Sequence, residues 1–176
     1  MGLNAQPSGE RVHIGFFGLR NAGKSSVVNR VTGQTLSIVS DVKGTTTDPV
    51  QKAMELLPIG PVVIIDTPGI DDEGALGAER VRRALRVLGK TDIAVLVTDS
   101  TRGLQPAEQE LLELFRKREI PFIIAHNKTD LTSAPAAVPE NEIYVSAAAD
   151  SNIRELKELI ARAVKPTEPE KRLVAD

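Results

Sequence analysis

The first residues with evident chemistry are the eight from Gly18 to Ser25, GLRNAGKS, which follow a short apolar run. They match the pattern of a glycine, four residues and Gly-Lys-Ser, in which the glycines let successive backbone N–H groups converge on a phosphate. The Lys24 ammonium can offset β- and γ-phosphate charge, and the Ser25 hydroxyl can bind Mg²⁺. We therefore expect a nucleoside triphosphate site in which Lys24 also serves catalysis, with phosphate contacts from Asn21, Ala22, Gly23, Lys24, Ser25 and Ser26.

A second set of polar residues follows the apolar run 62–65. Asp66 opens the sequence Asp-Thr-Pro-Gly, and a carboxylate at a strand end can hold Mg²⁺ directly or through water. Gly69 lets its backbone N–H approach a γ-phosphate, because it has no side chain. Both this segment and the loop 40–48 could instead be ordinary turns. That loop, SDVKGTTTD, offers three hydroxyls that could close on Mg²⁺ when the γ-phosphate is present: Thr45, Thr46 and Thr47.

The segment NKTD at residues 127–130 follows another apolar run, 122–125. The Asp130 carboxylate can accept two hydrogen bonds, from guanine N1–H and the 2-amino group, whereas adenine would leave it unpaired. The Asn127 amide can bridge the base and neighbouring loops, and the Lys128 stem can cover the base plane. Guanine O6 is then expected to meet backbone N–H groups from a segment of small residues: Ser146, Ala147 and Ala148.

These segments require strands that bring them to one place. Apolar runs and alternation predict strands at 12–17, 50–57, 62–65, 93–97, 122–125 and 143–145. Helical spacing and capping signals predict helices at 24–31, 78–88, 106–118 and 153–163. The short turn LPIGP pairs the second and third strands as an antiparallel hairpin, and the Pro-rich stretch 132–140 leaves one crossover without a good helix. The sequence thus predicts an α/β fold with a six-stranded, mostly parallel sheet, one antiparallel edge strand and helices on both faces.

Composition narrows the function classes. The chain has 176 residues, 41% hydrophobic, enough for one domain, and polar segments divide it into a disordered lead-in (1–10), the nucleotide domain (11–164) and a linker (165–176). It has no cysteine, so these residues offer no thiolates for an iron–sulfur cluster. The net charge of -2 predicts no nucleic-acid partner. No apolar run approaches the roughly 18 residues of a membrane span, so we expect a cytoplasmic domain without membrane contact.

Taken together, GLRNAGKS, the threonine loop, DTPG, NKTD and SAA resemble the translation-factor-related branch of small GTPase domains, over about residues 11–164. Asn21 and the sequence GTTTD are similar to the subgroup that includes the tRNA-modifying GTPase MnmE. The run VSDVKGTTTDPVQKAMELLPIGPVVIIDTPGIDDEGALG closely resembles the HydF family, GTPases that help to mature [FeFe]-hydrogenase. Its most specific parts are TTTDPV and KAMELLPIGPV, since the other motifs are generic.

The resemblance implies a P-loop fold of the small-GTPase type and slow hydrolysis of GTP to GDP and phosphate as a nucleotide switch. It implies that Thr46 senses Mg²⁺ and that Asn21 coordinates K⁺, whose charge would act as an arginine finger does. Ile70 follows DTPG where many switch GTPases have a glutamine, and an aliphatic side chain cannot orient water. The resemblance assigns that role to Asp72, although a solvated acidic loop is the alternative because acids flank this residue.

A HydF relationship further implies a dimerisation domain and a cysteine-containing cluster domain after the linker, with hydrogenase-maturation proteins as partners. Three other hypotheses stay open. The chain could belong to an RNA-modification or ribosome-assembly GTPase of the same branch. It could be an ATP-using kinase or ATPase, because the phosphate loop alone does not select the base. It could also bind nucleotide without hydrolysing it.

Overall fold

The structure is a computed structural model that describes residues 11–33, 50–66 and 77–164. The predicted lead-in 1–10, the whole threonine loop, the segment 67–76 and the linker 165–176 lie outside these residues. The described strands are β1 (Val12–Gly18), β2 (Val50–Leu56), β3 (Gly60–Asp66), β4 (Ile93–Asp99), β5 (Phe122–Asn127) and β6 (Glu142–Tyr144). The described helices are the 3-10 turn η3 (Arg20–Ala22), α1 (Lys24–Thr32), α2 (Gly77–Leu88), α3 (Pro106–Lys117) and α4 (Ile153–Val164).

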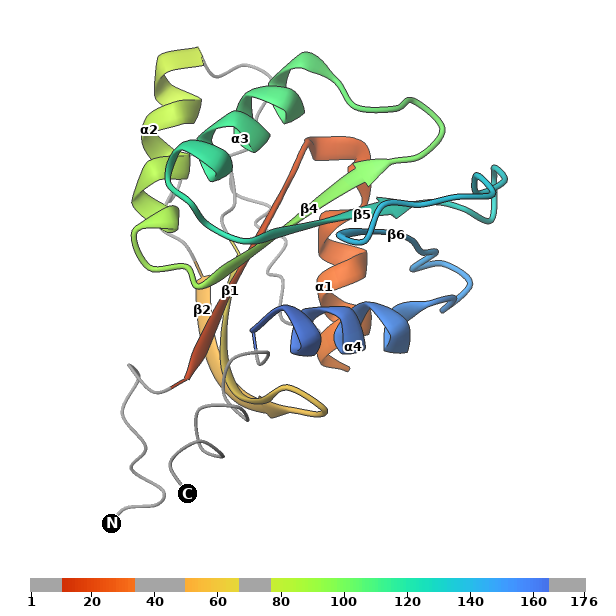
Figure 1. The fold of residues 1–176 in the computed structure, drawn as a ribbon, viewed down its shortest axis with the longest axis horizontal. Helices are drawn as coiled ribbons and strands as arrows, with labels where there is room; N and C mark the ends of the chain where they lie inside the picture. The colour runs from red at the N-terminus through yellow and green to blue at the C-terminus, as the bar shows by residue number, and fades with distance from the viewer. Residues whose placement is uncertain (1–10, 34–49, 67–76, 165–176) are drawn as a thin grey trace, which may run out of the picture.

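The six strands form one sheet in the order β2-β3-β1-β4-β5-β6. Only the β2–β3 pair is antiparallel, as the LPIGP turn predicts, and the other neighbours are parallel. Because sequential strands of a parallel sheet need crossovers, helices cover it on two sides (Figure 1). The predicted α/β class, strand count and single antiparallel pairing are confirmed.

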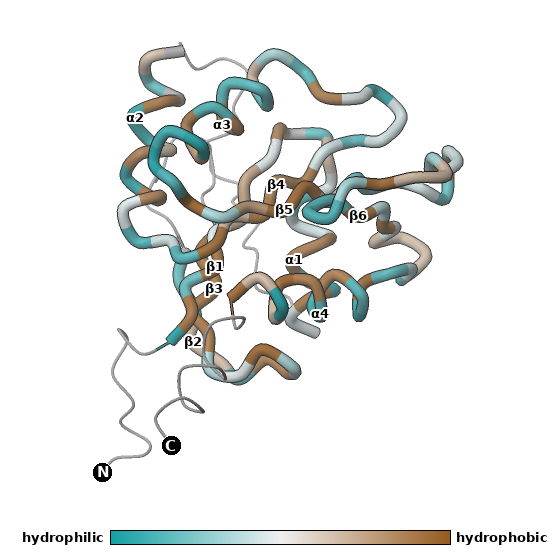
Figure 2. Tube along the Cα trace, viewed as in Figure 1, coloured by the Kyte–Doolittle hydropathy of each residue, from teal (hydrophilic) through white to brown (hydrophobic). Residues whose placement is uncertain are grey.

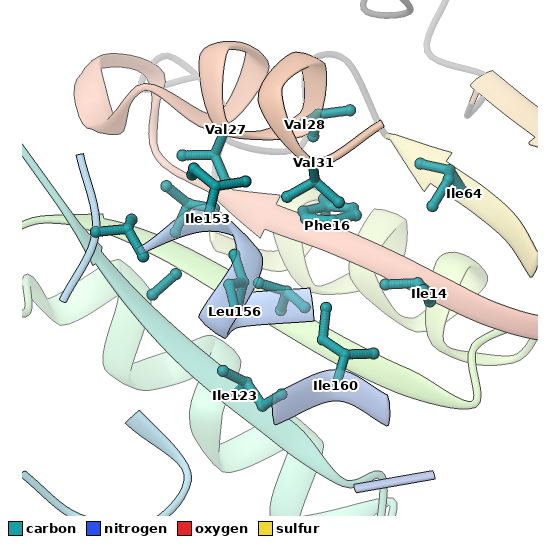
Figure 3. Packing of buried hydrophobic residues seen from close by; sticks show 14 of the residues in the cluster. Ile14, Phe16, Val27, Val28, Val31, Ile64, Ile123, Ile153, Leu156 and Ile160 are labelled. Carbon is teal, nitrogen blue, oxygen red and sulfur yellow. The ribbon is translucent and has the colours of Figure 1, made fainter. Parts of the chain in front are cut away.

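Two apolar clusters hold the helices against opposite faces of the sheet. Phe16 of β1 belongs to the cluster beneath α1 and α4, whereas its neighbour Phe17 belongs to the cluster beneath α2 and α3. Successive side chains of a strand point to opposite faces of the sheet, so one apolar run contributes side chains to both clusters. Figure 2 shows the resulting hydropathy, with largely apolar strands between helices in which hydrophilic and hydrophobic stretches alternate. Figure 3 shows the α1–α4 cluster, in which helical and strand side chains interlock: Ile14, Phe16, Val27, Val28, Val31, Ile64, Ile123, Ile153, Leu156 and Ile160.

Several strands extend beyond the apolar runs that predict them, three of them by two residues at one end. β3 begins at Gly60, β4 continues to Asp99 and β5 continues to Asn127, because ladder hydrogen bonds come from the backbone and do not require apolar side chains. The extension places two polar residues in register, Asp99 opposite Asn127. The carboxyl-terminal ends of these strands, which carry the polar motifs, are therefore regular β-structure. They give the motifs a rigid support.

The described connection between β5 and β6 has the structure that the sequence predicts. Between β5 and β6 the described chain contains turns and no helix, as the Pro-rich stretch predicts. His126 of β5 stacks on Tyr144 of β6, with ring centroids 4.3 Å apart, and its Nε2 lies 2.9 Å from Glu142 Oε1. These contacts fasten the short β6 to the sheet. No helix within the described ranges is long and apolar enough to cross a membrane.

Candidate nucleotide-binding site

The phosphate loop occupies the junction between β1 and α1. Gly18 ends β1, and a Cβ placed there would lie 2.7 Å from the Val97 carbonyl oxygen of β4, so a side chain would push these strands apart. Gly23 adopts φ 86°, a left-handed conformation that residues with a Cβ resist, and it begins α1 directly. The Val27 N–H bonds the Gly23 carbonyl at 3.0 Å. The exposed Ser25 and Ser26 therefore lie in the first turn of α1, where unpaired N–H groups favour an anion.

Lys24 and Asp66 form a buried ion pair within this junction. The Lys24 Nζ donates to Asp66 Oδ1 at 2.5 Å, and both residues are 7% exposed. Asp66 ends β3, whose parallel pairing with β1 brings the carboxylate beside the loop. The donor set fits Mg²⁺, because a serine hydroxyl and a carboxylate are hard oxygen ligands. Within the described residues there is no cluster of three or more His, Cys, Asp or Glu side chains that could hold a metal ion.

Asn127 joins the phosphate loop to the segment after β6. Its amide nitrogen donates to the Ala22 carbonyl at 2.9 Å, and its amide oxygen accepts from the Ala147 N–H at 3.0 Å. Only 3% of the residue is exposed. An added Cβ at Gly23 would clash with this same amide nitrogen. Asn127 therefore fixes the spacing between two segments that lie over 120 residues apart in the sequence.

Lys128 makes a second connection across the site. Its Nζ donates to the Asn21 carbonyl at 2.7 Å and lies 3.1 Å from Asp99 Oδ2. Asp99 also accepts from the Thr101 backbone N–H at 2.8 Å and from the Thr101 hydroxyl. Burial by itself raises the pKa of the Asp99 carboxyl, but the bonds from Thr101 and Lys128 outweigh it and lower this pKa from its ordinary value. An ionised Asp99 thus holds Lys128 in place.

The Asp130 carboxylate is oriented from the opposite side of the site. The Ser146 hydroxyl donates to Asp130 Oδ1 at 2.7 Å and accepts from the Ala149 N–H at 3.0 Å. Asp130 is exposed, whereas Ser146 is buried. The serine is therefore a fixed donor beneath a carboxylate that keeps its other oxygen available.

These elements surround a cavity of about 990 Å³. Arg30 of α1 also lines it, and its Nε donates to the Ala147 carbonyl at 2.8 Å. The cavity wall thus comes from the phosphate loop and α1 on one side and from the chain after β5 and β6 on the other: Gly23, Ser26, Asn29, Arg30, Gly33, Asn127, Lys128, Asp130, Leu131, Ala147, Ala148 and Asp150.

The structure brings most of the predicted site residues together. The phosphate-loop residues, Asp66, the NKTD residues and the SAA residues all lie around this junction. Three predicted residues lie outside the described parts of the chain: Thr46, Gly69 and Asp72. Sequence reasoning missed Asp99 and Arg30. An acid at the end of a buried strand was an available signal for Asp99, whereas nothing in the helical pattern of residues 24–31 marks Arg30.

The contact between Gly23 and Asn127 gives a direct test of this geometry. Gly23→Ala should lower the free energy of unfolding by more than about 2 kcal/mol, because a Cβ there strains the left-handed backbone and displaces the Asn127 amide from its bonds. Gly33→Ala is the matched control, since Gly33 has φ 72° but no atom within 4 Å of an added Cβ. The Gly33→Ala variant should lose only the free energy of unfolding that corresponds to the strained left-handed backbone, about 1 kcal/mol. Equal losses in urea unfolding would contradict the assigned contact.

Comparison with curated proteins finds relatives among bacterial GTPases. The chain is 36% identical over 155 residues to the tRNA modification GTPase MnmE of Legionella pneumophila (strain Paris), covering 86% of this chain and 34% of that protein. It is 42% identical over 125 residues to the GTPase Der of Maridesulfovibrio salexigens, covering 68% of this chain and 27% of Der. The chain thus spans about a third of the length of MnmE and about a quarter of the length of Der.

Solved structures show the same fold. The Era protein of Aquifex aeolicus, bound to GDP and AlF₄⁻, matches with a TM-score of 0.68 and 26% identity, over 86% of this chain and 56% of Era. A second Era structure, in complex with MgGDPNP and nucleotides of 16S ribosomal RNA, matches with a TM-score of 0.68 and 25% identity, over the same shares of both chains. The family described as 50S ribosome-binding GTPase matches residues 13–128, which contain the phosphate loop, Asp66 and the first residues of NKTD. The chain therefore belongs to this GTPase family and is a GTP-binding GTPase domain related to MnmE, Der and Era.

Proposed function

We propose that the described cavity is the guanine-nucleotide site and that each motif residue has the role expected from its chemistry. The observation that carries this proposal is the Asn127 amide, which bonds the phosphate loop on one side and the SAA segment on the other. One nucleotide has its phosphates at one end and its base at the other, so a bridge of this kind holds its two binding segments at a fixed separation. Asp130 then receives guanine N1–H and the 2-amino group, and the Lys128 stem covers the base.

Phosphate binding changes the partner of Lys24. In the structure its ammonium pairs with the Asp66 carboxylate, and on nucleotide binding we expect it to contact the β- and γ-phosphates instead. Asp66 and Ser25 are then available for Mg²⁺, with Thr46 closing over the same ion. A Mg²⁺ ion held by these residues would supply positive charge that offsets the charge of the phosphate oxygens. Gly69 is assigned to the γ-phosphate through its backbone N–H.

Hydrolysis is assigned to a K⁺ ion at Asn21 and to a water held by Asp72. Asn21 is exposed in the phosphate loop, and Lys128 fixes its backbone carbonyl at 2.7 Å. A side-chain amide oxygen on a fixed backbone is a suitable hard ligand for an alkali cation. The cation would stabilise negative charge that grows in the transition state, a task performed elsewhere by an arginine finger.

Guanine reading by Asp130 predicts a change of base preference. Asp130→Asn should weaken GTP and GDP binding and favour xanthine nucleotides, because the 2-oxo group of xanthine accepts from the new amide where guanine offers a donor. Competition binding with GDP and xanthosine diphosphate measures the preference, which should shift by at least about a hundredfold, the scale of a mismatched polar contact. Glu113→Gln, which changes an exposed acid of α3 that does not line this cavity, is the control and should keep guanine preference. Undiminished GDP affinity in the Asp130 variant would refute the assignment.

The K⁺ assignment predicts a salt-specific rate. GTP hydrolysis by the protein should be at least about tenfold faster in KCl than in NaCl at equal ionic strength. This acceleration is much smaller than the one that an arginine finger gives. Asn21→Ala should remove this difference while GDP still binds, because the backbone N–H groups of the loop remain. Asn141→Ala, which removes an amide near β6, should retain the difference. Equal wild-type rates in the two salts would eliminate the proposed ion.

For the whole protein, we propose an RNA-modification or ribosome-assembly GTPase of the MnmE and Der branch. The support comes from the relatives, whose names state tRNA modification for MnmE, and from the Era structure that contains ribosomal RNA. The earlier expectation that no nucleic acid binds stays a prediction for this domain alone, because attached domains could supply the RNA contact. The second candidate is hydrogenase maturation, favoured by the HydF-like runs TTTDPV and KAMELLPIGPV.

The full-length native protein distinguishes the two roles. Purified without oxygen, it should bind tRNA or ribosomal RNA with a Kd below about 1 μM, tighter than nonspecific binding at physiological salt, and affinity should differ between GTP and GDP states. Iron and acid-labile sulfide should be absent. Stoichiometric iron and sulfide together with no RNA binding would reject the RNA role and support the HydF alternative.

A further inference from the structure

Arg30 lies outside every motif yet contacts the guanine side of the cavity. It belongs to the last turn of α1, and its Nε donates to the Ala147 carbonyl at 2.8 Å across 117 residues of sequence. Its Nη1 lies 3.7 Å from Asp150 Oδ2, in the loop that follows Ala147. The guanidinium therefore fastens α1 to the SAA segment by one short bond and one longer charge contact.

The backbone of Ala147 is held from both sides. Its N–H donates to Asn127 Oδ1 at 3.0 Å, and its carbonyl receives Arg30 Nε, with the Asp150 N–H at a longer 3.4 Å. Only 3% of Ala147 is exposed. With both its N–H and its carbonyl bonded, Ala147 cannot turn its own donor towards a base without breaking the Asn127 bond. The next donor along the chain is the N–H of Ala148.

The orientation of the Ala148 N–H depends on the same carbonyl that Arg30 holds. The Ala147 carbonyl and the Ala148 N–H belong to one peptide unit, and in a trans peptide these two groups point in opposite directions. Ala148 is exposed and lines the cavity. The other residues of the described chain provide no hydrogen-bond acceptor for this N–H. Fixing the carbonyl from α1 thus also fixes a donor that is available to a ligand.

We propose that Arg30 is a positioning residue for base specificity: by holding the Ala147 carbonyl, it presents the Ala148 N–H to the 6-oxo group of a bound purine. The proposal rests on the guanine-nucleotide site proposed above, in which the SAA segment meets guanine O6, and it adds the residue that holds this segment in place. Asp130 reads the opposite edge of the base. A 6-oxo group accepts this hydrogen bond, whereas a 6-amino group would present a donor to a donor. Arg30 therefore favours guanine and hypoxanthine over purines with a 6-amino group.

The exposure of Arg30 separates this role from a structural one. Its side chain is 45% exposed and Asp150 is 61% exposed, so solvent screens their attraction and the pair adds little to folding stability. The bond to the Ala147 carbonyl, in contrast, sets the direction of a donor at the ligand. Removing the guanidinium should consequently alter base preference much more than stability.

The test compares Arg30→Met, which keeps a long apolar stem and removes the donors, with Arg154→Met. Arg154 is the matched control because it is an exposed arginine on α4 whose carboxylate contact is with its neighbour Glu155. Calorimetric titration uses three probes: GDP, inosine diphosphate and 2,6-diaminopurine riboside diphosphate. The first two carry a 6-oxo group and an N1–H, whereas the third carries a 6-amino group and no N1–H. Its poorer contact with Asp130 is the same in both variants and in the wild type, so each nucleotide is compared as the ratio of its variant and wild-type affinities.

Arg30→Met should weaken GDP and inosine diphosphate by the same factor, about tenfold, the loss of one hydrogen bond. Binding of the diaminopurine nucleotide should stay within about twofold, and the thermal midpoint without ligand should match that of Arg154→Met. Unchanged GDP affinity, or an equal loss for all three nucleotides, would overturn the role of Arg30 while leaving the guanine site intact. A wild-type protein that bound none of the three would instead overturn the proposed nucleotide site, and this inference with it.

Discussion

The buried amide of Asn127 is the interaction on which the rest of the site depends. Its nitrogen and oxygen each make one hydrogen bond, to segments that come from opposite ends of the sequence. A polar group with 3% exposure must be satisfied, because leaving it unpaired costs about 1–3 kcal/mol. The phosphate loop and the SAA segment are therefore held where this one side chain can reach both. The absence of a Cβ at Gly23 makes room for it.

The charged side chains around this amide also tie segments together. Lys24 pairs with Asp66 across β1 and β3, and Lys128 joins the Asn21 carbonyl to Asp99 across β5 and β4. Nucleotide binding is expected to change the hydrogen-bond partners of one lysine and not those of the other. In the proposed site, Lys24 would exchange its carboxylate partner for phosphate oxygens, whereas Lys128 would keep both partners because its stem, not its ammonium, is assigned to the base. One lysine is thus suited to respond to the nucleotide and the other to hold the site together.

The sheet explains how residues so distant in sequence meet. Parallel strands have their carboxyl ends at one edge, so Gly18, Asp66, Asp99 and Asn127 end four neighbouring strands side by side. The two apolar clusters fix the helices on each face and hence the start of α1 relative to that edge. Ligands of α/β sheets bind in this position for the same reason. The core therefore places the site, and the polar bridges then set its spacing.

The sequence by itself determined the approximate strands and helices, the antiparallel hairpin and the positions of the phosphate and base motifs, whose chemical roles stay predictions. Local periodicity and motif order suffice for these, because each depends on residues close together in the chain. The strand ends at Asp99 and Asn127 were not predicted, since backbone pairing continues beyond the apolar runs. Only the tertiary structure showed that Asp99 holds Lys128 and that Arg30 holds the Ala147 carbonyl. These are contacts between distant segments, and their partners are decided by the register of the sheet and the packing of α1 rather than by any local pattern.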